Sequence, residues 1–253
     1  MRNKFIAGNW KMNTTPAETT ALLQALIQKT TYIEKTTIMV APPFTNLPAA
    51  EEVIRNSKIK LGAQNLFWEE KGAYTGEISA SMLQNVGCSY VIIGHSERRQ
   101  YFKETDEDVN RKIHAALKHG LFPVICFGET LNQRESGQAM NVVENQVRSS
   151  LANFTISQAA QFTLAYEPVW AIGSGKAASP SDATEMHSRI RTILRELFDG
   201  ATAETIRIQY GGSVTPDNIS AFIPEEQIDG ALVGGACLKA ESFSKIIEAA
   251  EAV

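Results

Sequence analysis

Residues 162–168 read FTLAYEP, a short apolar run that ends on an acid followed by a proline. Seven other stretches have a similar form: FIAGNW at 5–10, TIMVAPP at 37–43, IKLGAQN at 59–65, YVIIGHS at 90–96, FPVICFG at 122–128, IRIQYGG at 206–212 and GALVGG at 230–235. Most of them are continuous apolar runs rather than strictly alternating ones. This pattern indicates strands of a parallel sheet that is covered on both faces.

The segments between these runs carry helix-start signals. Thr15, Ser179 and Thr215 each precede a proline, which places a capping hydroxyl before a proline at the first helical position. Thr105 precedes three acidic residues, which also favours a capped helix start. Eight strands alternating with helices predict an α/β fold, an eightfold β/α barrel, with an open doubly wound sheet as the alternative. No linker or shift in composition divides the chain, so we expect a single barrel domain over residues 1–253.

Composition excludes several classes of partner. The formal net charge is -4 and the largest basic cluster is the pair Arg98-Arg99, so we expect neither nucleic acid nor a membrane as a partner. The N-terminal apolar stretch is too short for a signal peptide, and no run approaches the roughly 18 apolar residues of a membrane span. Three widely spaced cysteines indicate reduced core thiols. These features predict a cytoplasmic protein.

Unusual polar residues follow the apolar runs. Because the carboxyl ends of barrel strands share one rim, we expect these side chains to converge there. They are Asn9 and Lys11 after the first run, Gln64 and Asn65 after the third, His95 and Glu97 after the fourth, and Glu167 after the sixth.

Each of these residues has a functional and a structural interpretation. Burial next to an apolar run should raise the pKa of Glu167 toward that of a usable base, although a buried ion pair is the alternative. Glu97 can serve in proton relay or simply pair with Arg98 and Arg99. Lys11 can be a solvated surface lysine. His95 can be a structural group, and the other three histidines, His114, His119 and His187, are expected on helix surfaces.

Two glycine clusters close the last two runs, Gly211-Gly212-Ser213 and Gly234-Gly235. In a barrel, backbone N–H groups of these loops often hold a phosphate, and glycine lets the ligand approach closely. This arrangement needs no net positive charge. A metal site is not supported, because no two histidines have ligand spacing and no carboxylates cluster with them.

The chain closely resembles the triosephosphate isomerase family along nearly its whole length. The resemblance rests on seven motifs in order: GNWKMN at 8–13, GAQN at 62–65, GAYTGE at 72–77, IIGHSERR at 92–99, AYEPVWAIGSGK at 165–176, YGGSV at 210–214 and GGACL at 234–238.

The resemblance implies interconversion of dihydroxyacetone phosphate and D-glyceraldehyde 3-phosphate, a step of glycolysis and gluconeogenesis, with no cofactor and no metal. Glu167 would be the base and His95 a neutral electrophile and proton shuttle. Asn9 and Lys11 would stabilise the enediolate, and Glu97 is kept as a further catalytic candidate. Backbone N–H groups of Gly173, Ser213, Gly234 and Gly235 would hold the phosphate.

The same resemblance assigns residues 168–178 to a closing lid. Its hinges would include Pro168, Val169, Trp170 and Lys176, and its tip Ala171, Ile172, Gly173, Ser174 and Gly175. Closure would bring the Gly173 N–H to the phosphate and exclude water from the enediolate.

The motif at 72–77 implies a homodimer. Its loop would project into a second copy of the chain with Thr75 as the contact, together with Tyr74 and Gln64. A plug on its own subunit is the alternative for this aromatic loop.

Two other functions remain open from the residues alone. Glu97 and Glu167 could form the carboxylate pair of a glycoside hydrolase, although Arg98 and Arg99 could neutralise Glu97. The same barrel could also bind a phosphorylated ligand without catalysis.

Overall fold

The computed structural model of the protein, which describes residues 2–172 and 178–253, contains a closed barrel of eight parallel strands in the order β1 to β8. The strands are β1 (Phe5–Asn9), β2 (Thr37–Ala41), β3 (Lys60–Ala63), β4 (Tyr90–Ile93), β5 (Phe122–Phe127), β6 (Thr163–Tyr166), β7 (Arg207–Tyr210) and β8 (Gly230–Val233). All eight predicted strands are present. Since β1 pairs with both β2 and β8, the sheet closes and the doubly wound alternative is wrong.

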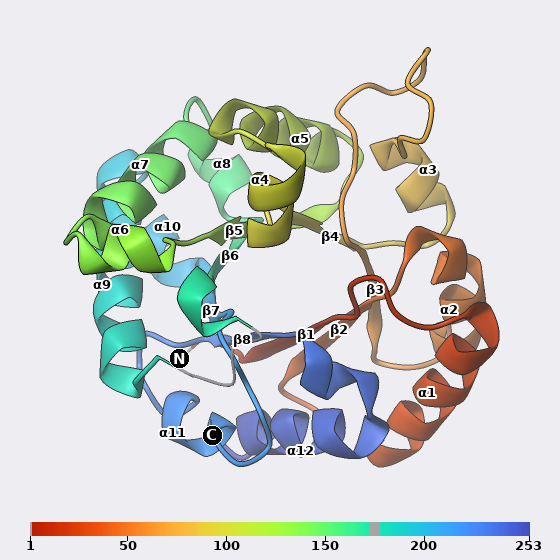
Figure 1. Cartoon of the computed structure of the whole chain (residues 1–253). Helices are drawn as coiled ribbons and strands as arrows, with labels where there is room; N and C mark the ends of the chain where they lie inside the picture. The colour runs from red at the N-terminus through yellow and green to blue at the C-terminus, as the bar shows by residue number, and fades with distance from the viewer. Residues whose placement is uncertain (1, 173–177) are drawn as a thin grey trace.

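Helices form a ring outside the strands, and the chain passes once around the barrel (Figure 1). The described helices are α1 (Pro16–Lys29), α2 (Leu47–Ile54), α3 (Ala80–Asn85), α4 (Ser96–Phe102), α5 (Asp106–Lys118), α6 (Leu131–Glu135), α7 (Ala139–Ser150), α8 (Ile156–Ala159), α9 (Pro180–Leu197), α10 (Gly200–Thr205), α11 (Ile219–Phe222) and α12 (Ala240–Glu251), with single 3-10 turns η1 (Phe44–Asn46), η2 (Val169–Ala171) and η3 (Gly235–Leu238). None of those helices is long and apolar enough to cross a membrane.

Three of the four predicted helix caps are confirmed. Thr15, Thr105 and Ser179 each form a capping box with the third helical residue. At Thr215 the contact differs, because Asn218 Oδ1 accepts a hydrogen bond from the Thr215 N–H at 2.9 Å. The chain there makes a turn over 216–218, and α11 begins at Ile219.

Strand alternation separates two hydrophobic clusters. Phe5, Ala7, Met39, Tyr90 and Ile92 belong to a small cluster inside the barrel. The residues between them pack outward against the helices in a second, larger cluster. Because successive strand residues point to opposite faces, each strand places its last inward residues at the carboxyl end of the barrel. The three cysteines are free and buried, as the sequence indicated.

His187 corrects one expectation, because its side chain is fully buried rather than on a helix surface. It lies on the stripe of α9 that also buries Ala183 and Ile190, at the spacing of one helix face. Its Nδ1 lies 2.9 Å from the carbonyl oxygen of Gln227. Burial lowers the pKa of His187 to about 4.

Candidate active site

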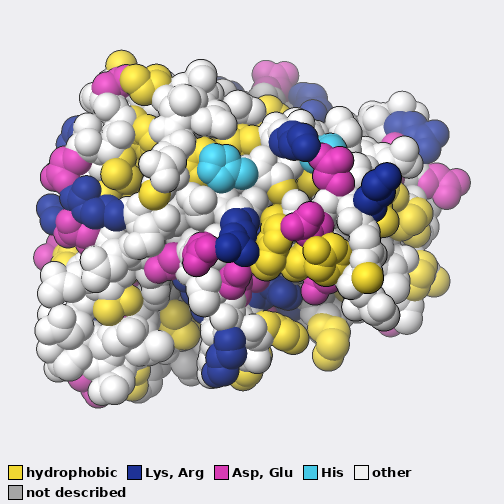
Figure 2. Space-filling view, turned by 90° about the horizontal axis from the view of Figure 1, so that it is seen from above, with side chains coloured by type: hydrophobic (Ala, Val, Ile, Leu, Met, Phe, Trp, Pro, Cys, Tyr) yellow, Lys and Arg dark blue, Asp and Glu magenta, His cyan; other side chains and the backbone are white. Residues whose placement is uncertain are grey.

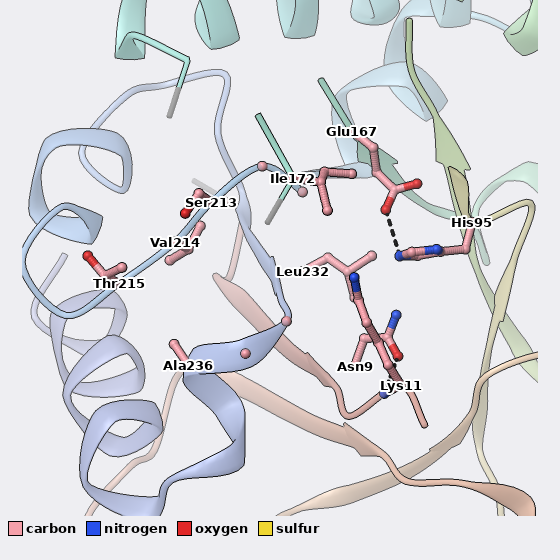
Figure 3. Close-up of a pocket in the computed structure, with 14 residues that line it drawn as sticks. Asn9, Lys11, His95, Glu167, Ile172, Ser213, Val214, Thr215, Leu232 and Ala236 are labelled. Atoms are coloured by element: carbon pink, nitrogen blue, oxygen red, sulfur yellow. Dashed lines mark hydrogen bonds and ion pairs between the residues drawn. The ribbon is translucent and has the colours of Figure 1, made fainter. Parts of the chain in front are cut away.

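A cavity of about 230 Å³ opens where the strands end, and most of the predicted polar residues meet around it. Asn9, Lys11, His95 and Glu167 lie on one side. Ser213, with Val214 and Thr215, lies on the side opposite His95 (Figure 3). Residues from the first, fourth, sixth, seventh and eighth βα loops therefore share a single site.

Glu167 follows β6 and is 1% exposed. Its Oε1 lies 3.0 Å from His95 Nε2, and its Oε2 accepts a hydrogen bond from the Ser96 N–H at 2.8 Å. The backbone is held on both sides, because the Glu167 N–H donates to Phe127 O and the Gly211 N–H donates to Tyr166 O, each at 2.7 Å. Neighbouring strands thus fix the position from which this carboxylate acts.

The predicted direction of the Glu167 pKa is wrong in this arrangement. Burial raises the pKa, but His95, the Ser96 N–H and Lys11 together lower it below its ordinary value. Burial of the acid was predicted correctly, but its hydrogen-bond donors come from residues distant in the sequence and were not predicted. The side chain is therefore an ionised carboxylate at neutral pH.

His95 is the N-cap residue of α4. Its Nδ1 accepts a hydrogen bond from the Glu97 N–H at 3.2 Å, while its Nε2 faces Glu167. A neutral imidazole with its proton on Nε2 satisfies both contacts, whereas an imidazolium has no acceptor for the Glu97 N–H. Burial opposes a charge on the ring, and the Glu167 carboxylate outweighs it and raises the pKa of His95. We favour the neutral tautomer, because it alone uses both contacts.

Lys11 is not a free surface lysine. Its φ of 54° lies in the left-handed region, which a residue with a side chain adopts only when its surroundings hold it there. Asn9 Oδ1 accepts from its N–H at 3.1 Å, and Gln64 Nε2 donates to its carbonyl at 2.8 Å. Its Nζ lies 2.6 Å from Glu97 Oε1. Three side chains thus direct Lys11 to the cavity.

The predicted pairing of Glu97 with the adjacent arginines is wrong. Arg98 pairs with Glu104 at 2.8 Å, and Arg99 pairs with Asp106 at 2.5 Å. Both guanidinium groups on α4 pair with carboxylates in the segment that follows this helix. Glu97 instead forms its ion pair with Lys11. The ion pair of Glu97 thus belongs to the site.

Glycine-rich loops after β7 and β8 complete the wall of the cavity. Gly234 lies beside Lys11, since an added Cβ would be in ordinary contact with Lys11 Cε at 3.6 Å, and a Cβ on Gly235 would have open space around it. Turn η3 begins at Gly235, so its first N–H groups are free of partners within the turn. A Cβ on Gly212 would lie 2.2 Å from Tyr210 Oη, which requires glycine there. The arrangement suits an anion held by backbone donors.

Both ends of the predicted lid are described, and its middle is not. Pro168, Val169, Trp170, Ala171 and Ile172 form the first part, with turn η2 in it, and Ile172 lines the cavity. Gly173, Ser174, Gly175 and Lys176 lie outside the described residues.

Contacts to the two ends of the lid were not anticipated from the sequence. Glu129, fully buried, accepts from Trp170 Nε1 at 2.8 Å, and the Ala178 N–H donates to Tyr210 Oη at 3.1 Å. Gly128 is equally unexpected, because an added Cβ would lie 1.7 Å from the Glu167 carbonyl oxygen. The available signals were an acid and a glycine at the end of the fifth apolar run, the same position that marked Glu167 in the sixth.

The predicted dimer residues divide into two groups. Tyr74 and Thr75 are exposed on the loop between β3 and α3, which extends away from the barrel (Figure 1). Gln64 instead points inward and donates to the carbonyl oxygens of Lys11 and Ala41 within the chain. Over the described residues, no group of three or more His, Cys, Asp or Glu side chains could hold a metal ion.

Fold and site together define a β/α-barrel protein with a buried carboxylate–imidazole pair and glycine-rich loops around one cavity. Comparison with known proteins is more specific. Residues 4–250 match the family model described as triosephosphate isomerase. The chain belongs to the triosephosphate isomerase family.

Individual relatives agree over almost the full length. The chain is 55% identical to the triosephosphate isomerase of Caldanaerobacter subterraneus subsp. tengcongensis, over 98% of this chain and 99% of that protein. It is 52% identical to that of Endomicrobium trichonymphae, over the same shares of the two chains. The crystal structure of triosephosphate isomerase from Bartonella henselae superposes with a TM-score of 0.89 at 39% identity, covering 98% of each chain.

Proposed function

We propose that this chain interconverts dihydroxyacetone phosphate and D-glyceraldehyde 3-phosphate through an enediolate. Family membership supports the reaction. The observation that carries the proposal is the buried Glu167 carboxylate, 3.0 Å from His95 Nε2, on one wall of the cavity that Lys11 and the glycine loops also line. Proton transfer next to a carbonyl needs a base, an electrophile and a means of holding the substrate, and the cavity has candidates for all three.

Glu167 is the base in this proposal. Its carboxylate removes a proton from the carbon next to the carbonyl and returns it to the neighbouring carbon. To reach the substrate it must turn away from the Ser96 N–H and His95. Since those donors lower its pKa, leaving them in a site that excludes water makes the carboxylate more basic.

His95 polarises the carbonyl and moves protons between the two substrate oxygens. The neutral ring has an N–H at Nε2 to donate to the carbonyl oxygen, and it receives the hydroxyl proton of the enediol in return. Lys11 and Asn9 stabilise the negative charge that develops on the enediolate. Glu97 holds the Lys11 ammonium in place rather than exchanging protons with the substrate.

In this proposal the phosphate is bound by backbone N–H groups of Ser213, Gly234, Gly235 and Gly173. The lid, residues 168–178, closes over the substrate and excludes water, which protects the enediolate from losing phosphate. Its first part is tied to Glu129 and its end to Tyr210, which gives closure two fixed supports.

A homodimer is part of the proposal. The loop carrying Tyr74 and Thr75 is exposed, and Met12, beside Lys11, is 96% exposed. Hydrophobic side chains also gather on the side of the barrel that bears α4 and α5 (Figure 2), and Phe102 at the end of α4 is 67% exposed. A second copy would cover these apolar groups and place its loop beside Lys11.

Sedimentation equilibrium tests this part directly. Thr75→Arg should shift the chain from dimer to monomer and lower turnover together, because the larger charged side chain cannot be accommodated in a close contact. An intact dimer in that variant would refute the assigned interface.

We also propose that residues 1–253 work as a single catalytic domain in the cytoplasm. A single closed barrel carries every proposed catalytic group, so one chain supplies them all. The three buried free thiols suit a reducing compartment.

Turnover of glyceraldehyde 3-phosphate by the purified chain tests the reaction. Formation of dihydroxyacetone phosphate is followed with a coupling dehydrogenase, beside Glu167→Gln prepared in the same way. Rapid turnover that is lost in the variant is expected. A folded wild type that binds inorganic phosphate but turns over no triose phosphate would leave a non-catalytic binder; sustained cleavage of aryl glycosides would instead support a glycoside hydrolase.

A further inference from the structure

The loop that follows β7 is held by one side chain outside the predicted site, Asn218. Its Nδ2 donates to the carbonyl oxygen of Ser213 at 3.0 Å, and its Oδ1 accepts from the Thr215 N–H at 2.9 Å. The single amide therefore bridges the two residues that flank Val214. All three of those residues line the cavity.

The two hydrogen bonds of Asn218 hold a segment that lies outside any helix or strand. Residues 213–215 belong to neither β7 nor α11. In the part of the chain that the structure describes, no backbone group forms a hydrogen bond with the Ser213 carbonyl or the Thr215 N–H. The last backbone bond that holds the chain before this loop is from the Gly211 N–H to Tyr166 O, and Gly212, which directly precedes Ser213, adds no side-chain restriction of its own. Within the described residues, the Ser213 carbonyl and the Thr215 N–H thus depend on the Asn218 amide for their hydrogen bonds.

Asn218 is itself firmly anchored. It precedes α11, whose Ile219 and Phe222 are buried. The Phe222 ring stacks on Tyr210 with centroids 4.4 Å apart, and Tyr210 Oη accepts from the Ala178 N–H. The Asn218 amide consequently links the loop at 213–215 to the packed core.

We propose that Asn218 is a positioning residue for the phosphoryl group of the substrate. By fixing the Ser213 carbonyl and the Thr215 N–H, it keeps the Ser213 N–H turned toward the phosphate before the substrate arrives. Preorganised donors bind an anion more tightly because no ordering accompanies binding. The proposal rests on the proposed function, which assigns the Ser213 N–H to the phosphate.

The amide is chemically suited to this task, since it is a donor and an acceptor at once. Aspartate at 218 would keep the acceptor for the Thr215 N–H but would set a carboxylate oxygen against the Ser213 carbonyl. It would also add negative charge next to the phosphoryl group. Asn218→Asp should therefore be more harmful than Asn218→Ala, which only removes both bonds.

The test separates phosphate binding from general stability. In Asn218→Ala, the KM for glyceraldehyde 3-phosphate and the Ki of inorganic phosphate should both rise roughly tenfold with kcat little changed, which is the pattern of lost uniform binding. In Asn218→Asp both should rise further. Turnover of D-glyceraldehyde, which lacks the phosphoryl group, should be unchanged in kcat/KM.

Asn110→Ala is the matched control. Asn110 on α5 also uses its amide to hold loop carbonyls, those of Ser150 and Ala152 at 2.9 and 3.1 Å, but it lies outside the residues that line the cavity. It should lose similar stability and keep a normal KM. If Asn218→Ala does not fold, Asn218→Ser, which retains one oxygen near the loop, takes its place.

Unchanged KM and phosphate Ki in the Asn218 variants would overturn the proposal, as would an equal loss in Asn110→Ala or in D-glyceraldehyde turnover. Failure of the proposed reaction is a separate outcome, because it appears as absent turnover in the wild type. In that case the dissociation constant of inorganic phosphate, measured by calorimetry in wild type and Asn218 variants, still decides whether Asn218 positions the loop.

Discussion

The two ends of the barrel are made from the same strands but hold different kinds of side chain. At the amino end, the Phe5 and Tyr90 rings lie 5.1 Å apart and Tyr90 and Phe122 5.4 Å apart, with the Arg207 guanidinium 4.6 Å from the centre of Phe5. At the carboxyl end, β1 ends at Asn9, His95 lies two residues after β4, and Glu167 directly follows β6.

The difference shows how one sheet divides stability from chemistry. At the amino end, aromatic rings pack against one another and against the Arg207 guanidinium, all within the chain. The carboxyl end brings a carboxylate, an imidazole and a strained lysine together around a cavity, an arrangement that packing alone would not favour. Substitutions at the two ends should therefore move different measurable quantities.

The largest expected effect is on turnover at the carboxyl end. Glu167→Asp should lose on the order of a hundredfold in kcat, because it retracts the carboxylate by about 1 Å from the proton-transfer geometry. Its thermal unfolding should stay close to that of the wild type. Near-normal turnover in a correctly folded variant would remove Glu167 as the base.

The counterpart at the amino end is Phe122→Ala. Phe122 is 40% exposed, so its loss should cost about 2 kcal/mol of unfolding free energy, less than the truncation of a fully buried ring. Urea denaturation measures this cost, and kcat at a temperature where the variant is folded should match the wild type. A large fall in kcat would show that the two ends are not independent.

Gly211→Ala tests how tightly the backbone supports the base. An added Cβ would lie 2.9 Å from Glu167 Cγ, so the side chain must shift and kcat should fall roughly tenfold. Gly200→Ala is the control, since its Cβ would meet nothing within 4 Å. Equal kcat in both variants would mean that Glu167 tolerates the displacement.

The smallest effect concerns the helical ring rather than either end. His187 has a pKa of about 4 in the folded chain, below that of an exposed histidine, so it is held neutral by the fold. As pH falls below about 6.5, the unfolded chain takes up a proton that the folded chain refuses, and by pH 5.5 this should remove about 1 kcal/mol of stability.

Urea midpoints measured from pH 7.5 to 5.5 in wild type and His187→Gln, at one protein concentration, test this linkage. The variant starts from a lower stability but should lose less of it as pH falls. Parallel pH dependences would show that His187 is not the group responsible.

The sequence predicted the barrel well because each strand carries its own signal. Eight separate apolar runs fixed the strand count, and hydroxyl caps such as Thr15 marked helix starts. Convergence of Asn9, Lys11, His95 and Glu167 followed from the rule that barrel strands end on one rim. These are local or topological properties and need no knowledge of side-chain partners.

What escaped prediction depends on long-range partners. Lys11 and Glu97 are 86 residues apart in the chain, and Ser96 and Glu167 are 71 apart, so the ion pair and the lowered pKa of Glu167 could not be derived from neighbours in sequence. His187 followed a polar pattern locally, but its position on the buried stripe of α9 decided its environment.

Isomerisation in D2O tests the central claim most directly. The account predicts that dihydroxyacetone phosphate formed from glyceraldehyde 3-phosphate by the wild type carries solvent deuterium on the carbon that received the proton, detectable by NMR, and that Glu167→Gln forms neither product nor label above the uncatalysed rate. Rapid product formation without any deuterium under conditions of full solvent exchange, or unchanged labelling in Glu167→Gln, would contradict proton transfer through Glu167.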